Sequence, residues 1–157
     1  MFLLLVIVAG LTGTLCMSLV MWFIHDRGWA NADMIRAVGS LLTRRYQNSL
    51  LPGLVLHAAA GCIFAIGYVL VIRSVGIASA LVIMEVGLAI GAFHGAAMVF
   101  IMMAVAEKHP VEHFQKAGPQ VGWAHMAGHI AYGGGVGLAI ALLGPRLGEI
   151  TRTLPVP

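Results

Sequence analysis

Residues 50–72, with the sequence LLPGLVLHAAAGCIFAIGYVLVI, decide the fold of this chain. The stretch contains no Asp, Glu, Lys or Arg, and it is long enough for a helix that crosses a bilayer, which needs about 20 residues. Because hydrocarbon offers no hydrogen-bond partners, a segment in contact with lipid must satisfy its own backbone groups, as an α-helix does. We therefore predict a membrane-spanning helix that carries one imidazole, His57, within the bilayer.

Three further stretches, at residues 2–24, 77–106 and 121–143, are also long and apolar. Hydrophobic residues make up 60% of the chain and charged residues only 10%, whereas charged residues are about a quarter of a typical soluble domain. A short turn separates the second and third stretches, which is typical of antiparallel neighbours in a bundle. The sequence thus predicts one all-α domain, residues 1–157, that forms an integral membrane four-helix bundle.

Two polar loops, residues 25–49 and 107–120, must lie on the same side of such a bundle. Because an excess of Lys and Arg marks the cytoplasmic side, we predict a protein of the prokaryotic inner membrane with these loops in the cytoplasm. The basic residues form no stripe with interleaved aromatics, so the expected partners are the lipid bilayer and membrane proteins, and not nucleic acid. The loops contain Arg27, Arg36, Arg44, Arg45, Lys108 and Lys116, and the opposite side contains Arg73, Arg146 and Arg152.

The first loop contains a short amphipathic pattern. Apolar residues recur at helical spacing, opposite a polar face, and Asn31 is a candidate N-cap. This pattern predicts a short helix that lies in the membrane interface between the first two spans. The apolar positions are Met34, Ile35, Val38, Leu41 and Leu42, and the polar ones are Arg36, Ser40 and Arg44.

Histidines inside the predicted spans are the strongest indication of function. They are His57, His94, His125 and His129, with Cys16 at a similar depth. At 1.5 Å per helical residue, these groups lie within one slab, about 6 to 18 Å below the loop face. An imidazole in hydrocarbon must be paired, bind a ligand or face a cavity. The pattern therefore indicates a buried polar site.

Four interpretations of this site remain open, and one of them is a proton path through the histidines. In an up-down bundle the second and fourth spans are diagonal, so His57 and His129 could face each other as axial ligands of a haem b. Alternatively, together with His94, His125 or Cys16, they could bind copper, zinc or iron. In the third interpretation the histidines fasten helices by hydrogen bonds, with Tyr68, Tyr132, Glu85 or backbone carbonyls as partners.

The second loop adds two H-x-x-x-H pairs, His109 with His113 and His125 with His129. Membrane hydroxylases and desaturases use such clusters at a di-iron site, although this chain lacks their H-x-x-H-H elements. Residues 109–113 also match the H-x-x-E-H pattern of inverted zincins. Pro110 instead favours a helix start with His109 at the cap position. A metal-dependent membrane enzyme is therefore an alternative function.

Four methionines are further candidate metal ligands, and one carboxylate is a candidate for proton transfer. Met17 and Met21, and Met98 and Met102, are each spaced i, i+4, and thioethers favour Cu(I), although Met also fills apolar cores. Glu85 is a candidate for a proton path, which would fit an oligomeric transporter of a small solute, an ion or a proton.

A resemblance covers most of the chain. The second and fourth spans share H-x-x-x-G, at His57 and at His129, which suggests two parallel repeats. Residues 9–21 (AGLTGTLCMSLVM), residues 39–42 (GSLL) and the motif GHIAYG at 128–133 resemble a group of small prokaryotic four-span membrane proteins of unknown function, whose last helix carries a G-H-x-x-Y-G-like motif. The resemblance implies the four-helix fold and no activity.

Taken together, the sequence predicts a non-catalytic membrane component. It would bind a metal or haem through intramembrane histidines, or dock in a larger membrane complex. Its Gly-rich spans are typical of close helix packing, so a homo-oligomer or other membrane subunits are expected as partners.

Overall fold

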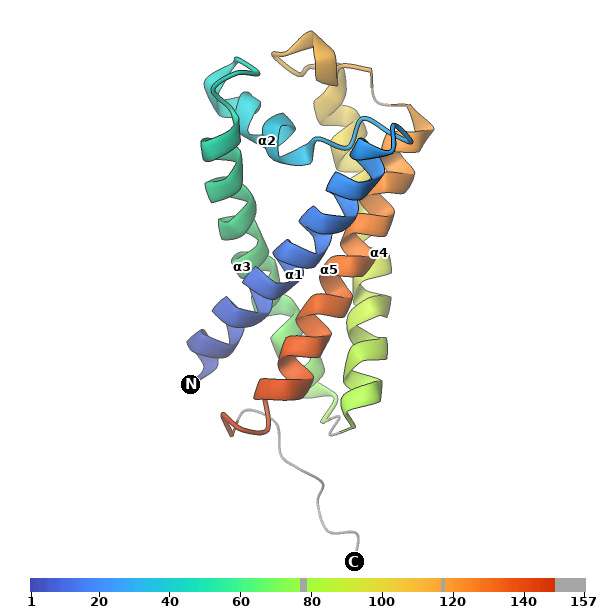
Figure 1. Ribbon diagram of the computed structural model, residues 1–157. Coiled ribbons are helices and arrows are strands. Elements are labelled where there is room, and N and C mark those ends of the chain that lie inside the picture. Colours follow the sequence, from blue (N-terminus) through green and yellow to red (C-terminus); the bar gives the residue numbers. More distant parts are fainter. Residues whose placement is uncertain (77–78, 117, 149–157) are drawn as a thin grey trace, which may run out of the picture.

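The computed structural model describes residues 1–76, 79–116 and 118–148. Within these ranges the chain is all-α, as predicted, and four helices are long and apolar enough to cross a membrane. They are α1 (Phe2–Asp26), α3 (Leu50–Ser74), α4 (Ala80–Glu107) and α5 (Pro119–Leu143). The short helix α2 (Met34–Thr43) lies across one end of the bundle, and the 3-10 turn η1 (Glu112–Phe114) lies at the same end (Figure 1).

We call this end of the bundle the loop end, and the opposite end the terminal end. The four spans agree with the predicted ones to within about two residues where both are described. The last helix begins at Pro119, because proline lacks the N–H that the first turn of a helix leaves unpaired. The predicted start of the third span, Ile77, lies outside the described residues, and α4 begins after Ser79 in extended conformation.

The spans are arranged in a ring that is open on one side. Helix α5 packs between α1 and α4, α3 packs mainly on α1, and α3 makes few contacts with α4 or α5. This agrees with the expected diagonal placement of the second and fourth spans. Glycines bring the packed helices close: a Cβ on Gly87 would lie 2.5 Å from the Gly133 carbonyl, and one on Gly10 would lie 2.6 Å from Cys62 Cα.

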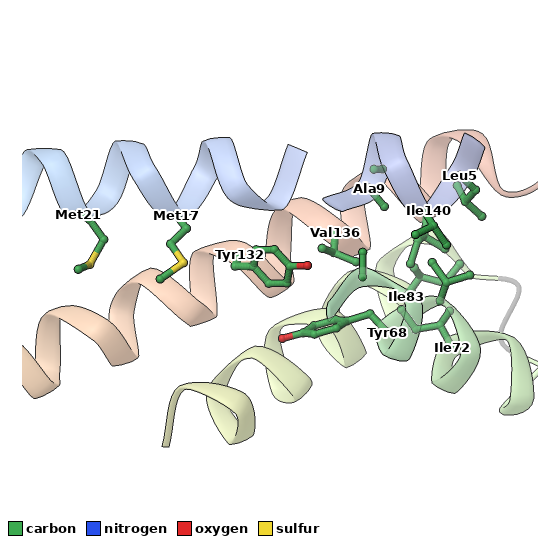
Figure 2. Close-up of a cluster of buried hydrophobic side chains, with 14 of the residues drawn as sticks. Leu5, Ala9, Met17, Met21, Tyr68, Ile72, Ile83, Tyr132, Val136 and Ile140 are labelled. Atoms are coloured by element: carbon green, nitrogen blue, oxygen red, sulfur yellow. The ribbon is translucent and has the colours of Figure 1, made fainter. Parts of the chain in front are cut away.

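The apolar core fills the terminal end of the bundle. Leu5, Ile72, Ile83 and Ile140 meet there from all four spans and are fully buried (Figure 2). Tyr68 and Tyr132 follow toward the middle, and beyond them the buried side chains of α1 are methionines. The hydrophobic core therefore ends near the two tyrosines, and polar residues begin.

The outer surface is apolar, as a lipid-facing surface must be. Large side chains such as Leu15, Ile63, Phe93 and Phe100 are 60% to 80% exposed. The chain's tryptophans are also exposed, and all belong to the loop end: the last turns of α1, the following turn and the first turns of α5. Trp prefers the membrane interface, so these residues mark where the bilayer ends. They are Trp22, Trp29 and Trp123.

The amphipathic helix exists, but its predicted N-cap was wrong. Its N-cap is Asp33, whose side chain accepts a hydrogen bond from the Arg36 N–H, whereas Asn31 donates to the His113 carbonyl in the other loop. Its buried face includes Ser40, while Leu41 and Leu42 are exposed. The physical reason is the close approach of α2 to α3, described next.

Helix α2 is held against α3 by two glycines. A Cβ on Gly39 would overlap the Ser49 carbonyl, and one on Gly53 would overlap the Ile35 carbonyl. Only residues without a side chain permit this backbone contact, so Gly39 and the neighbouring Ser40 must face α3. Helix α2 thus covers the loop end of the bundle where α3 and α4 are not packed together.

Candidate functional site

A cavity of about 70 Å³ lies on the loop side of the buried tyrosines. Imidazoles line it from three different spans: His57 on α3, His94 on α4 and His129 on α5. Thioethers line it from three helices as well. These belong to Met17 on α1, Met34 on α2 and Met98 on α4.

His94 and His129 form the closest pair in this cavity. Their ring centroids are 4.4 Å apart, and the rings are tilted by 50°. The ring of Phe64 lies 4.4 Å from that of His94, and the Tyr68 hydroxyl is 3.3 Å from His94 Nδ1. Aromatic packing and one hydrogen bond therefore fix the His94 ring and leave its other nitrogen free to bind.

Several nitrogens in this cavity are buried without a hydrogen-bond partner. They are His94 Nε2 and both ring nitrogens of His129, whose side chain is only 5% exposed. An unpaired polar group in a protein interior costs about 1–3 kcal/mol. A bound ligand or water would relieve this cost.

The floor of the cavity is closed by tyrosine. The Tyr132 hydroxyl donates a hydrogen bond of 2.5 Å to the Gly61 carbonyl and so links α5 to α3. Its ring packs edge-on against Tyr68 at 5.4 Å. These contacts separate the polar cavity from the apolar core of the terminal end.

The structure separates the predicted pair His125 and His129. His125 Nδ1 donates to the Val121 carbonyl at 2.8 Å, and its Nε2 is buried without a partner. Its side chain lines a different, smaller pocket beneath the loops, together with Asp33 and His109. His125 therefore does not line the cavity that holds His129.

The loop histidines also have separate roles. His109 Nε2 donates to the Ala37 carbonyl at 3.0 Å, and its Nδ1 accepts from the Val111 N–H at 3.1 Å. His113 is exposed and packs beside the Tyr46 ring. The expected helix start at Pro110 was wrong: Val111 is extended, and the 3-10 turn begins at Glu112. His109 Nε2 fastens the loop to α2, while the bond from the Val111 N–H to Nδ1 holds the loop in this extended shape.

Two further sequence candidates lie outside the cavity. Cys16 faces α5, because a Cβ on Gly135 would lie 2.9 Å from its sulfur. Glu85 is exposed near the beginning of α4. Over the described ranges, no three His, Cys, Asp or Glu side chains converge closely enough to hold one metal ion.

Comparisons with known protein families, curated proteins and solved structures find no match. The site must therefore be interpreted from its own geometry. Sequence reasoning missed the contribution of Met34, since only the folding of α2 over the bundle brings it to the cavity.

Proposed function

We propose that this multi-pass membrane protein binds one Cu(I) ion in the histidine-lined cavity. The observation that carries the proposal is the convergence of imidazoles and thioethers on one cavity, where three ring nitrogens lack partners. His94 and His129 are the proposed imidazole ligands. Met17 and Met98 supply thioethers from neighbouring positions.

The size of the cavity favours an ion over a haem. Sites for organic ligands and cofactors measure about 300–1,000 Å³, whereas this cavity measures about 70 Å³. Helices α3 and α5 would have to move apart before His57 and His129 could bind a haem between them as axial ligands. An ion needs only small changes of side-chain rotamers.

The donor set favours Cu(I) over zinc or iron. Thioethers are soft ligands that select Cu(I), and imidazole suits copper as well. The cavity lining includes no carboxylate, so the charge of a bound ion is not neutralised by its ligands. A monovalent ion therefore costs less to place at this depth than a divalent one. Cu(I) also accepts as few as two or three ligands, so two imidazoles and a thioether suffice, which is consistent with the absence of a cluster of three His, Cys, Asp or Glu in the described residues.

The proposal is that of a non-catalytic binding component. The loop histidines that an enzyme would need do not join the cavity, and Glu85 lies on the outer surface. We also propose that the chain is related to the small four-span membrane proteins that it resembles. It would associate with further membrane subunits or with a second copy of the chain.

Cu(I) titration of the purified protein in detergent, in competition with the chelator bicinchoninate, tests the proposal. We expect one bound ion, and X-ray absorption should show nitrogen and sulfur neighbours. His129→Ala should lower the affinity by about 100-fold or more, since even outer-shell partners of a metal contribute 10- to 100-fold. His113→Ala is the control, because its exposed ring is outside the cavity. The proposal fails if the wild type binds no Cu(I), or if both variants bind it equally while remaining helical.

A further inference from the structure

A second cavity of about 170 Å³ lies between α1, α2 and α3. We call it the vestibule. Ser18, Met21 and His25 line it from α1, Met34 from α2, and His57 from α3. A water molecule occupies about 30 Å³ in the liquid, so the vestibule has room for several.

The vestibule reaches from the loop end to the proposed copper site. Its outer residues belong to the last turn of α1 and the first turn of α3, where Trp22, His25 and Leu50 are exposed. Its inner residues are Met34 and His57, and both also line the histidine-lined cavity. The two cavities are therefore neighbours that share these side chains as a wall.

One face of α1 carries donor atoms along this whole path. Met17 lines the inner cavity, whereas Met21 and His25 line the vestibule. Residues four apart lie on one face of a helix, and at 1.5 Å per residue they are about 6 Å from one another along the axis. An ion can thus pass from one donor to the next in short steps. Asp33 adds a carboxylate to the vestibule lining.

Met34 closes the inner end of this path. Its side chain is only 9% exposed, and methionine is unbranched and adopts several rotamers easily. A change of its rotamer would connect the cavities without moving α2, which the Gly39 and Gly53 contacts hold in place. At the terminal end, by contrast, fully buried Leu5, Ile72 and Ile83 fill the interior.

We propose that the vestibule is a hydrated access route by which Cu(I) reaches the inner cavity from the loop side only, with His25 as its first ligand. The identity of the ion rests on the proposed function. The one-sided access does not rest on the proposed function, because it follows from the positions of the two cavities and from the packed terminal end.

Cysteine accessibility tests the route without any metal. In a chain with Cys16→Ala and Cys62→Ala, Ser18→Cys places a thiol in the vestibule, and Leu19→Cys places one on the outer surface at the same depth. The test needs membrane vesicles of both orientations and a membrane-impermeant methanethiosulfonate that carries a sulfonate. Ser18→Cys should be modified when the loop side faces the reagent and lose all labelling in the opposite orientation, and Leu19→Cys should be unmodified in both.

Three results would overturn the route. These are an unreactive Ser18→Cys, its modification from the terminal side, and equal modification of both thiols. The copper titration is independent of this experiment. A labelled vestibule in a protein that binds no Cu(I) would leave the route standing and refute the proposed function.

Loading kinetics test the role of His25. His25→Gln should slow Cu(I) uptake from the chelator complex by about tenfold, because it removes a donor at the mouth of the vestibule, and residues around a metal site contribute about 10- to 100-fold. The equilibrium affinity should stay unchanged, because His25 does not line the inner cavity. His113 is also exposed but lies outside the vestibule, so His113→Gln should load at the wild-type rate. Equal rates for the two variants would contradict the role of His25.

Discussion

At the scale of single residues, His109 shows how a histidine can be structural. It is 4% exposed, and its two ring nitrogens join the loop before η1 to the backbone of α2. His109→Ala removes both bonds and leaves the Ala37 carbonyl without this donor. We expect the free energy of unfolding to fall by about 1–3 kcal/mol, as measured by denaturant titration in detergent micelles. The exposed His113→Ala should change it by less than about 0.5 kcal/mol, and equal losses would disprove the fastening role.

The residue scale also shows what sequence can reveal about the site. His57, His94 and His129 could be found because an imidazole is unusual in an apolar span. His125 could not be distinguished from His129, since both are on one helix face, and only the position of α2 and the loops places them in different pockets. Met34 could not be found either, because nothing in the sequence shows which way α2 packs.

At the loop end, outside the spans, the titratable hydroxyl of Tyr46 makes a hydrogen bond to Asp33. It donates to Asp33 Oδ2 at 2.9 Å, and the Arg36 guanidinium lies over its ring at 4.9 Å. Burial and the neighbouring Asp33 carboxylate raise the pKa of Tyr46 above its usual 10.0, although Arg36 opposes this. Tyr46 therefore stays protonated and continues to support the N-cap residue of α2 at neutral pH.

At the scale of helices, glycine positions decide which faces meet. The two glycines of the H-x-x-x-G motifs occupy related places: Gly61 packs on α1, and Gly133 packs on α4. The hydrophobic pattern predicted four spans correctly because length and apolarity suffice for that. It did not predict which face of α2 packs on the bundle, since burial there follows the Gly39 and Gly53 contact and not side-chain hydrophobicity.

A glycine substitution tests this account of helix packing. Gly133→Ala would place a methyl group against the Gly87 carbonyl and the Gly91 Cα, so α4 and α5 must separate. Overpacking of this kind costs about 1–3 kcal/mol, and we expect the free energy of unfolding in micelles to fall accordingly. Gly67→Ala is the matched control: it is in α3, nothing lies within 4 Å of the new methyl group, and alanine favours helix by about 1 kcal/mol. A similar loss of unfolding free energy in both variants would contradict the close packing of α4 on α5.

At the scale of the whole molecule, the two ends of the bundle differ in kind. The terminal end is a packed apolar core, whereas the loop end contains the histidines, the vestibule and the covering helix α2. Asn31 bonded to the His113 carbonyl, and Tyr46 packed on His113, confirm that both long loops lie at one end. The side of the cell membrane that this end faces stays a prediction from the basic residues.

Labelling of intact cells with an impermeant thiol reagent tests that prediction. Six basic loop residues against three on the opposite side predict that the loop end lies in the cytoplasm, because Lys and Arg are retained there. In the chain without native cysteines, Gln115→Cys should be protected and Ser74→Cys, exposed at the terminal end, should react. The opposite pattern would reverse the topology. The result also decides where the proposed ion comes from: a cytoplasmic loop end requires that Ser18→Cys react from the cytoplasmic face, and therefore that copper be taken up from the cytoplasm.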